Sequence, residues 1–517
     1  MRGFVTWAQR GAGAVLTRVD AALDRLYGSR FNPLYQSGAL VVLCMVVLTA
    51  TGLYLTLFYR VGAPYDSVQR VTEQAWAGRW IRALHRYASD AAVAAAALHA
   101  FRLFVQDRFW GPRALAWVSG LVLLFAVLVC GWTGYVMVWD VQAQVLAVEG
   151  ARILDALPIF SEPIGRAFSG ERALPGAFFF LNLFAHIGLP VGLGLLLWLH
   201  VSRLARPKLL PPRGLAWATV GILATVSIAW PVGMAPPADL LRVPAGAPYD
   251  LFYAFWLPVS LRLSAGAVWG VGAAIALAVL LVPALARPAR ARRPPPSVTD
   301  EERCTACMQC HIDCPYEAIA MVERPGSLKG TVARVTPELC VSCGICAGSC
   351  APMLVGPPGR NGRQQMTDVR ARTAQWRGAI PDVAIVSCER AADPGAPAGT
   401  AVHRVSCAGG VHTSVVEQLL RAGAGGVFLV ACPTRDCRER EGPQWLSERL
   451  YHDREAELQA RVDRRRVRLL HLGAGRGREA RAELERFQGE IAALRRETEA
   501  EPELVRLCRS VEEEVAT

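Results

Sequence analysis

Four histidines in the apolar half of the chain have the side-chain type and spacing to ligate iron. They form two pairs with the same separation, His85 with His99 and His186 with His200. Fourteen residues of helix advance ~21 Å and return to within about 40° of the starting face, so each helix would carry two imidazoles on one stripe. Because polar groups at membrane depth are costly and usually functional, this spacing favours two bis-histidine haem sites over hydrogen-bonded packing histidines.

Eight cysteines in the polar half form two runs with the spacing C-x2-C-x2-C-x3-C. The first run is Cys304, Cys307, Cys310 and Cys314, and the second is Cys340, Cys343, Cys346 and Cys350. This is the spacing of iron–sulfur cluster ligands. Such ligands must remain free thiolates, so we expect a reducing compartment. Zinc is the alternative, which eight cysteines in this double spacing disfavour.

A third set of cysteines lies between residues 379 and 475: Cys388, Cys407, Cys432 and Cys437. The first three each end a short apolar stretch, and parallel strands would bring them to one edge of a sheet. We expect a further cluster here, with free structural thiols and zinc as alternatives. A thiol-redox role is disfavoured because this segment has no C-x-x-C pair.

The histidines require membrane helices to position them. Six stretches are long and apolar enough to cross a bilayer of about 30 Å, roughly at 37–59, 81–105, 114–139, 177–202, 214–234 and 265–286. The second and fourth spans run in the same direction, so His85 meets His186 and His99 meets His200. Six spans place both chain ends on one side of the membrane.

Basic residues are concentrated on that side. They include Arg10, Arg18, Arg25, Arg30, Arg102, Arg108, Arg113, Arg203, Arg206, Lys208, Arg213, Arg287, Arg290, Arg292 and Arg293. By the positive-inside rule, both termini and the cysteine-rich half are cytoplasmic, in a multi-pass protein of a bacterial-type inner membrane. The formal charge of +12 follows from these arginines. Since no aromatic residues are interleaved with them, nucleic acid is not an expected partner.

Composition divides the chain into segments of different character. We predict an amphipathic N-terminal segment at 1–36, a transmembrane domain at 37–286, a Pro- and Arg-rich linker at 287–299, a cysteine-rich domain at 300–358, a small α/β domain at 379–475 and a charged helical tail at 476–517. The predicted fold class is multidomain. An all-α membrane bundle of six helices precedes a small α+β domain and an α/β domain with a parallel sheet.

Residues of about 30–285 resemble the cytochrome b of quinol-oxidising bc complexes. The matching residues are two glycine pairs, two arginines near the histidines, the run Gly134-Tyr135-Val136 and the loop 153–170; the glycines and arginines are Gly38, Gly52, Gly120, Gly134, Arg82 and Arg102. A missing side chain lets a flat macrocycle approach the backbone. The resemblance implies two haems b on the four histidines, propionate contacts for the arginines, quinone as substrate and a possible homodimer.

Several positions depart from the pattern of that family. Its Pro-Glu-Trp-Tyr motif for quinol oxidation is missing, and the nearest text is Ala247-Pro248-Tyr249-Asp250. Val138-Trp139-Asp140 replaces Pro-Trp-Gly, and Ala205 stands where the inner quinone site has a histidine. We therefore expect a transmembrane electron wire rather than a proton-pumping Q-cycle, and neither a Rieske protein nor a cytochrome c as partner.

The two cysteine runs resemble a bacterial two-cluster ferredoxin, in which the fourth cysteine of each run crosses to the other cluster. The resemblance implies one 4Fe–4S cube on Cys304, Cys307, Cys310 and Cys350, and another on Cys340, Cys343, Cys346 and Cys314. Residues of about 379–475 resemble the delta subunit of methyl-viologen-reducing hydrogenases. That implies a 2Fe–2S cluster and a flavoprotein partner of heterodisulfide-reductase type, although Ala391 stands where that family tends to have another cysteine.

Three electron-carrying modules in one chain predict a membrane subunit of a quinone-linked oxidoreductase complex. Electrons would pass between a cytoplasmic flavoprotein or iron–sulfur oxidoreductase subunit and the quinone pool, through the clusters and the two haems. The enzyme would be an electron-transfer oxidoreductase that does not act on a soluble substrate alone. One alternative is quinol-driven reduction of a low-potential cytoplasmic acceptor. The other is a membrane anchor or redox sensor.

Overall fold

The structure is a computed structural model. It describes residues 2–159, 162–168, 174–202, 204–242, 250–288, 293–325, 330–376, 380–395, 400–452, 454 and 456–515. The chain divides into two compact units. The helical unit comprises Met1–Gln9, Gln36–Arg203 and Pro207–Arg287, and the mixed unit comprises Arg10–Tyr35, Leu204–Arg206 and Pro288–Thr517.

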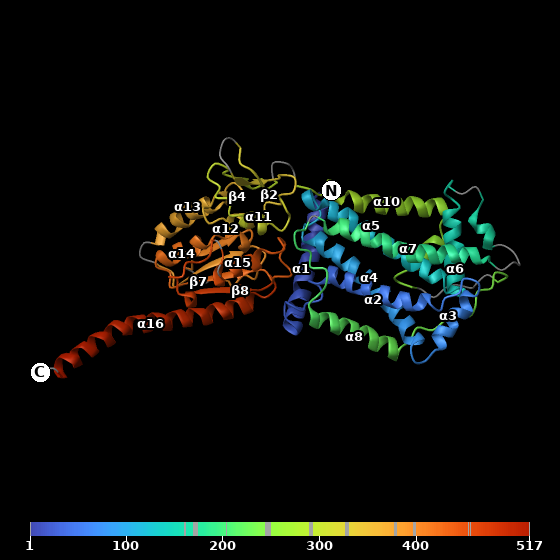
Figure 1. The fold of residues 1–517 in the computed structure, drawn as a ribbon, viewed down its shortest axis with the longest axis horizontal. Helices are drawn as coiled ribbons and strands as arrows, with labels where there is room; N and C mark the ends of the chain where they lie inside the picture. The colour runs from blue at the N-terminus through green and yellow to red at the C-terminus, as the bar shows by residue number, and fades with distance from the viewer. Residues whose placement is uncertain are drawn as a thin grey trace. The chain divides into compact units, whose positions relative to one another are not determined.

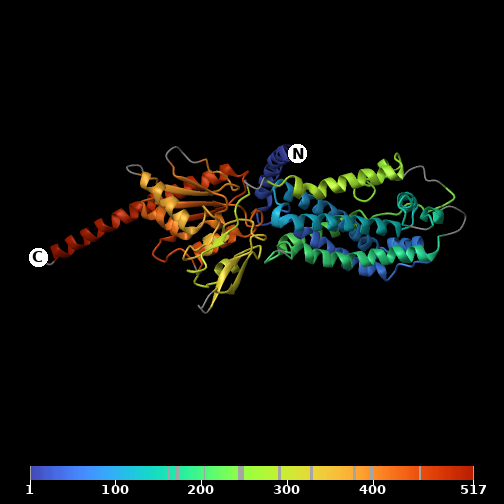
Figure 2. The same cartoon turned by 90° about the horizontal axis from the view of Figure 1, so that it is seen from above.

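Five apolar helices of the helical unit are long enough to cross a membrane. They are α2 (Ser37–Thr56), α4 (Gly78–Val105), α5 (Ala114–Val136, preceded by the 3-10 turn η1, Gly111–Arg113), α7 (Gly176–Val201) and α10 (Ala265–Leu285). Helix α2 packs on α4, and α5 packs on α7. Figures 1 and 2 show these helices running alongside one another. The chain is therefore a multi-pass membrane protein.

The predicted span at 214–234 forms a shorter helix. Helix α8 (Arg213–Ala229) has 17 residues and packs against α4. It ends before Trp230 because Pro231 disfavours a helical conformation in the residue that precedes it. The count of six spans remains a prediction.

Short helices connect these spans. They are α3 (Pro64–Glu73), α6 (Val141–Leu154), η2 (Ile164–Phe168) and α9 (Leu257–Ser260). Asp140 caps α6, since its carboxylate accepts a hydrogen bond from the Ala143 amide at 3.0 Å. Parts of the predicted loop 153–170 and the stretch Ala247-Pro248-Tyr249 lie outside the described residues, as do Arg203, Arg290 and Arg292.

The predicted amphipathic N-terminal segment contains helix α1 (Arg2–Tyr27). Trp7, Val15 and Leu26 are exposed on it. After the helix ends, Asn32 and Tyr35 both donate hydrogen bonds to the Asp24 carboxylate, at 2.8 and 2.9 Å. These contacts fix the turn that follows α1.

The cysteine-rich segment of the mixed unit is built from two antiparallel strand pairs. Strand β1 (Val298–Thr299) pairs with β4 (Val355–Gly356), and β2 (Ile319–Glu323) pairs with β3 (Thr331–Val335). Two short helices, α11 (Gln309–Ile312) and α12 (Ile345–Ser349), each carry part of one cysteine run. Since β1 belongs to this fold, the last residues of the predicted linker are part of it.

A four-stranded parallel sheet is the centre of the C-terminal part of the mixed unit, as the alternating pattern predicts. Its order is β6-β5-β7-β8, from strands β5 (Val383–Cys388), β6 (Val402–Val405), β7 (Gly426–Ala431) and β8 (Val467–His471). The helical elements around it are α13 (Gly362–Thr373), η4 (Ala374–Trp376), η5 (Ala408–Gly410), α14 (Thr413–Arg421), α15 (Gly442–Tyr451) and η6 (Arg464–Arg466).

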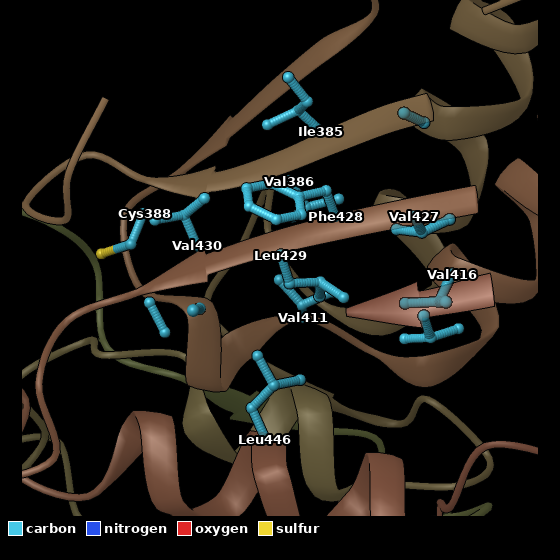
Figure 3. Close-up of a cluster of buried hydrophobic side chains, with 14 of the residues drawn as sticks. Ile385, Val386, Cys388, Val411, Val416, Val427, Phe428, Leu429, Val430 and Leu446 are labelled. Carbon is cyan, nitrogen blue, oxygen red and sulfur yellow. The ribbon is translucent and has the colours of Figure 1, made fainter. Parts of the chain in front are cut away.

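The buried core lies on this sheet. Ile385, Phe428 and Leu429 are fully buried in it, as Figure 3 shows. Helix α16 (Gly477–Val515), which contains most of the predicted charged tail, begins as part of the same core. Its Phe487 ring lies 5.9 Å from the Phe428 ring, so the first part of the helix covers the sheet rather than being solvated all round.

Candidate functional site

The structure brings the four membrane histidines together in the two predicted pairs. His85 of α4 and His186 of α7 have ring centroids 6.3 Å apart. His99 of α4 lies close enough to His200 of α7 for the two rings to interact electrostatically. Two helices with matched spacing thus present two pairs of facing imidazoles.

Each predicted glycine lies against one of these imidazoles. A Cβ atom would come 2.8 Å from His99 Cε1 at Gly38, 3.3 Å from His85 Cε1 at Gly52, 3.0 Å from His200 Cε1 at Gly120, and 2.9 Å from His186 Cε1 at Gly134. The distances at Gly38 and Gly134 are too short for a Cβ atom unless the ring moves, and those at Gly52 and Gly120 are tighter than ordinary contacts, so glycine keeps each ring in place. Four histidines seated on four glycines fit the requirements of two bis-histidine haems.

A hydroxyl group beside each glycine lies near Nδ1 of the imidazole, and at His186 the Cys130 carbonyl oxygen is closer still, at 2.9 Å. The distances to Nδ1 are 3.5 Å (Ser37 to His99), 2.9 Å (Thr51 to His85), 3.0 Å (Ser119 to His200) and 3.2 Å (Thr133 to His186). The hydroxyls of Thr51 and Ser119 donate to helix carbonyls at 2.8 and 2.7 Å, so they accept from Nδ1–H. Nε2 then carries the lone pair that ligates iron.

Sequence reasoning missed these hydroxyl residues. The signal was present, because a Ser or Thr immediately precedes each of the four glycines and repeats with the same spacing of fourteen residues. A hydroxyl can accept a hydrogen bond from a ring N–H without adding the bulk that the glycine avoids.

We expect the Thr51→Val variant to raise the reduction potential of the haem held by His85. Loss of the Thr51 hydroxyl removes one of two acceptors of the ring N–H, the other being the Leu48 carbonyl, and so makes the imidazole a weaker donor to iron. The lost hydrogen bond corresponds to about 1 kcal/mol. A redox titration of the haem absorption band measures the change. Thr49→Val is the matched control, because the Thr49 hydroxyl donates to the Met45 carbonyl of its own helix and, among the described residues, to no histidine. Equal potentials in both variants would contradict the assignment.

The two predicted propionate arginines lie near the two ends of α4. Arg82 donates a hydrogen bond to the Val232 carbonyl oxygen at 2.8 Å. Arg102 is buried in the last turn of the helix. Their contact with haem propionates remains a prediction.

A polar cluster that sequence reasoning did not predict lies next to His85. Arg86 forms ion pairs with Asp90 and, at 2.5 Å, with Asp250. The Tyr135 hydroxyl donates to Asp250 at 2.7 Å, and the amide of Tyr253 donates to it at 2.6 Å. Although burial opposes ionisation, the hydrogen bonds from Tyr253 and Tyr135 hold the pKa of Asp250 below its ordinary value.

The ferredoxin-like cysteines are grouped in the crossed sets that the resemblance implies. Burial raises the pKa of Cys350, and the neighbouring thiolates of Cys307 and Cys304 raise it further. In the same way, burial and the thiolates of Cys340 and Cys314 raise the pKa of Cys346 to about 12. The fourth cysteine of each run therefore lies with the first cysteines of the other run.

Both runs have the same backbone conformation. Ala306 and Met308 of the first run have positive φ, and so do the corresponding Ser342 and Gly344 of the second. Backbone amides point at the sulfur atoms, as from Leu354 to Cys350 Sγ at 3.3 Å. Such N–H···S bonds stabilise thiolates and tune a bound cluster.

The cysteines of the C-terminal domain meet at the carboxyl edge of the parallel sheet. Cys388 and Cys432 end neighbouring strands, with sulfurs 3.7 Å apart. The hydrogen bond between them lowers the pKa of Cys388 to about 7 and raises that of Cys432. Cys407 and Cys437 also share a hydrogen bond, and the Cys437 thiolate acts on Cys388 and Cys432. The four thiols thus form one buried group.

Among the described residues, no three His, Cys, Asp or Glu side chains have the tight geometry of a single-ion site.

Each of the three regions is similar to known proteins. A family model for cytochrome b/b6/petB matches residues 22–207. Cytochrome b6 of Synechococcus sp. (strain JA-3-3Ab) is 30% identical over 159 residues, which are 30% of this chain and 74% of that protein. The chain belongs to the cytochrome b family. Family models for a 4Fe-4S binding domain and for the delta subunit of methyl-viologen-reducing hydrogenase match residues 297–320 and 387–495.

This cytochrome b family member is therefore a fusion with a ferredoxin-type segment and a hydrogenase delta-subunit domain, as predicted. A chain of a solved structure named Hyperthermophilic respiratory Complex III is also similar. It is 18% identical with a TM-score of 0.40, over 50% of this chain and 78% of that chain. The family matches identify a membrane electron-transfer oxidoreductase that uses haem b and a 4Fe–4S cluster.

Proposed function

We propose that this chain is the membrane subunit of a quinone-linked oxidoreductase complex. It passes electrons between a cytoplasmic flavoprotein or iron–sulfur oxidoreductase subunit and the quinone pool. The observation that carries the proposal is the grouping of five ligand sets in one chain, namely two histidine pairs and three cysteine quartets. A membrane anchor would not need facing histidines with both glycine and hydroxyl support.

Each set is assigned one redox group. The pairs His85–His186 and His99–His200 hold one haem b each, and the two crossed cysteine sets hold one 4Fe–4S cube each. Cys388, Cys407, Cys432 and Cys437 hold a 2Fe–2S cluster. When bound, these groups accept and release single electrons. The protein residues hold them, set the histidine tautomers and exclude water.

The cluster around Asp250 supports a quinone link at the His85 end of the helical unit. Reduction of a quinone takes up protons as well as electrons. The Asp250 carboxylate, which Arg86 keeps ionised, and the Tyr135 phenol that donates to it form a hydrogen-bonded pair along which a proton can pass. Asp250 belongs to the stretch that most resembles the missing family motif, so we infer that the chemistry of quinone binding is altered rather than lost.

The quinone link can be tested on the purified full-length chain in detergent. The haems are first reduced with a limiting amount of dithionite, and an oxidised short-chain quinone is then added. We expect the absorption band of the reduced haems to disappear after the quinone is added. Haem that stays reduced would contradict the quinone link, while the absence of any b-type band would contradict the haem assignment itself.

We expect the Asp250→Asn variant to slow this reoxidation about 10²-fold, because a general acid–base group contributes at least that much to proton transfer. The haem content and the dithionite-reduced spectrum should not change. Stopped-flow absorbance measures the rate. Asp66→Asn is the control, since Asp66 is an exposed residue in the first turn of α3. A rate equal to that of the control would exclude Asp250 from the quinone reaction.

A further inference from the structure

The ligand loops of two cysteine sets touch through their main chains. A Cβ atom on Gly410 would meet the Gly344 carbonyl oxygen at 3.1 Å and the Cys343 carbonyl oxygen at 3.7 Å. Gly410 follows Cys407 by three residues, and Gly344 directly follows Cys343. The loop that carries Cys407 therefore lies against the loop that carries Cys343, with no side chain between them.

Arg360 joins the same two loops. Its guanidinium donates to the Ser406 hydroxyl at 2.6 Å, and to the hydroxyl and carbonyl oxygens of Ser342 at 2.8 and 2.9 Å. Ser406 immediately precedes Cys407, and Ser342 immediately precedes Cys343. One planar, permanently charged side chain thus fixes the distance between the two ligands.

Close backbone packing makes this junction rigid. A Cβ atom on Gly409 would lie 2.3 Å from Gly442 Cα, and one on Gly348 would lie 2.7 Å from the Gly409 carbonyl oxygen. Arg449 is fully buried here and donates to the Gly409 carbonyl oxygen at 2.7 Å and to the Ser349 hydroxyl at 3.1 Å. Helix α12, turn η5 and helix α15 are therefore locked together.

We propose that the cluster held by Cys314, Cys340, Cys343 and Cys346 and the cluster held by Cys388, Cys407, Cys432 and Cys437 form a fixed electron-transfer pair, with Arg360 as the residue that positions them. The inference rests on the proposed function, because it requires both clusters. One electron leaves the reduced cluster and reduces the oxidised one, and no bond forms or breaks. The C-terminal domain then exchanges electrons with this cube in preference to the cube on Cys304, Cys307, Cys310 and Cys350, although the Cys350 carbonyl oxygen also lies 3.2 Å from His412 Nε2 of that domain.

Electron paramagnetic resonance of the fully reduced full-length chain tests the pairing. The Cys432→Ser variant should lack the C-terminal cluster. Any magnetic splitting that disappears in this variant is therefore assigned to the interaction between the two clusters of the pair. We expect the same splitting to disappear in Cys343→Ser and to persist in Cys307→Ser. Persistence in Cys343→Ser together with loss in Cys307→Ser would overturn the proposal, because the other cube would then be the neighbour.

Arg360→Gln tests the positioning role without removing a ligand. We expect unchanged iron content, a weaker splitting and shifted potentials for both clusters, with partial recovery in Arg360→Lys. Arg363→Gln, an exposed arginine of α13, should behave like the wild type. Unchanged splitting and potentials in Arg360→Gln would overturn the assignment of Arg360. If the wild-type chain contained only the iron of the two 4Fe–4S cubes, the C-terminal cluster would be absent and the proposed function would be contradicted instead.

Discussion

Replacing His99 with leucine is expected to lower the haem content from about two per chain to about one, because an apolar side chain cannot replace an axial ligand. The remaining haem should be the one held by His85 and His186, which lie with their own glycine and hydroxyl partners. The pyridine haemochrome spectrum of the purified protein measures the haem content. Electron transfer between the clusters and the quinone should stop, since the relay loses one site.

His403→Leu is the control for this experiment. His403 lies in strand β6 of the parallel sheet, and burial lowers its pKa to about 4, so it is a neutral histidine outside the membrane helices. The variant should keep about two haems per chain. Retention of both haems in the His99 variant, or equal loss in both variants, would show that His99 is not an axial ligand. His200→Leu should reproduce the spectrum of the His99 variant.

The second large effect is expected from Cys314→Ser. Although Cys314 belongs to the first cysteine run, it lies with Cys340 and Cys346 of the second. The variant should therefore lose the cube of the second run and about four irons per chain. Its low-temperature magnetic spectrum should match that of Cys340→Ser. Cys350→Ser should instead match Cys304→Ser.

Cys44→Ser serves as the control for the cysteine variants. Cys44 is buried in helix α2, away from the cysteine runs in sequence and in a different unit. It should leave the iron content unchanged. If Cys314→Ser matched Cys304→Ser, each run would hold its own cube and the crossed sets would be wrong.

Much of the fold could be predicted because it depends on short-range patterns. The period of the helix makes His85 and His99 share a face, and long apolar stretches require a membrane. The strand-ending cysteines, such as Cys388 and Cys432, indicated a common sheet edge because parallel strands end together. The helix boundaries were less predictable. Helix α8 ends at Ala229 because of the local effect of Pro231, which the apolar stretch alone does not reveal.

Other features could not be predicted because they join residues that are distant in sequence. The ion cluster of Arg86 and Asp250 joins positions 164 residues apart. Helix α13 is polar, with no clear apolar stripe, yet it carries Val369 into the core of the sheet. Helix α16 is likewise rich in charged residues, so its sequence does not indicate that Phe487 and Ile491 are buried. Both are core residues because the helix packs on the sheet.

The sequence by itself indicated which side chains can hold the redox groups, because histidines with equal spacing on two helices and cysteines with ligand spacing in two runs are local patterns. The direction of the second and fourth spans indicated how the histidines pair, while the crossed cysteine sets were implied by the resemblance to ferredoxins. Only the tertiary structure decided which hydroxyl orients each imidazole, and which cysteine loops touch. Those contacts depend on side chains such as Thr51 and Arg360 reaching residues far along the chain, so no local pattern can encode them.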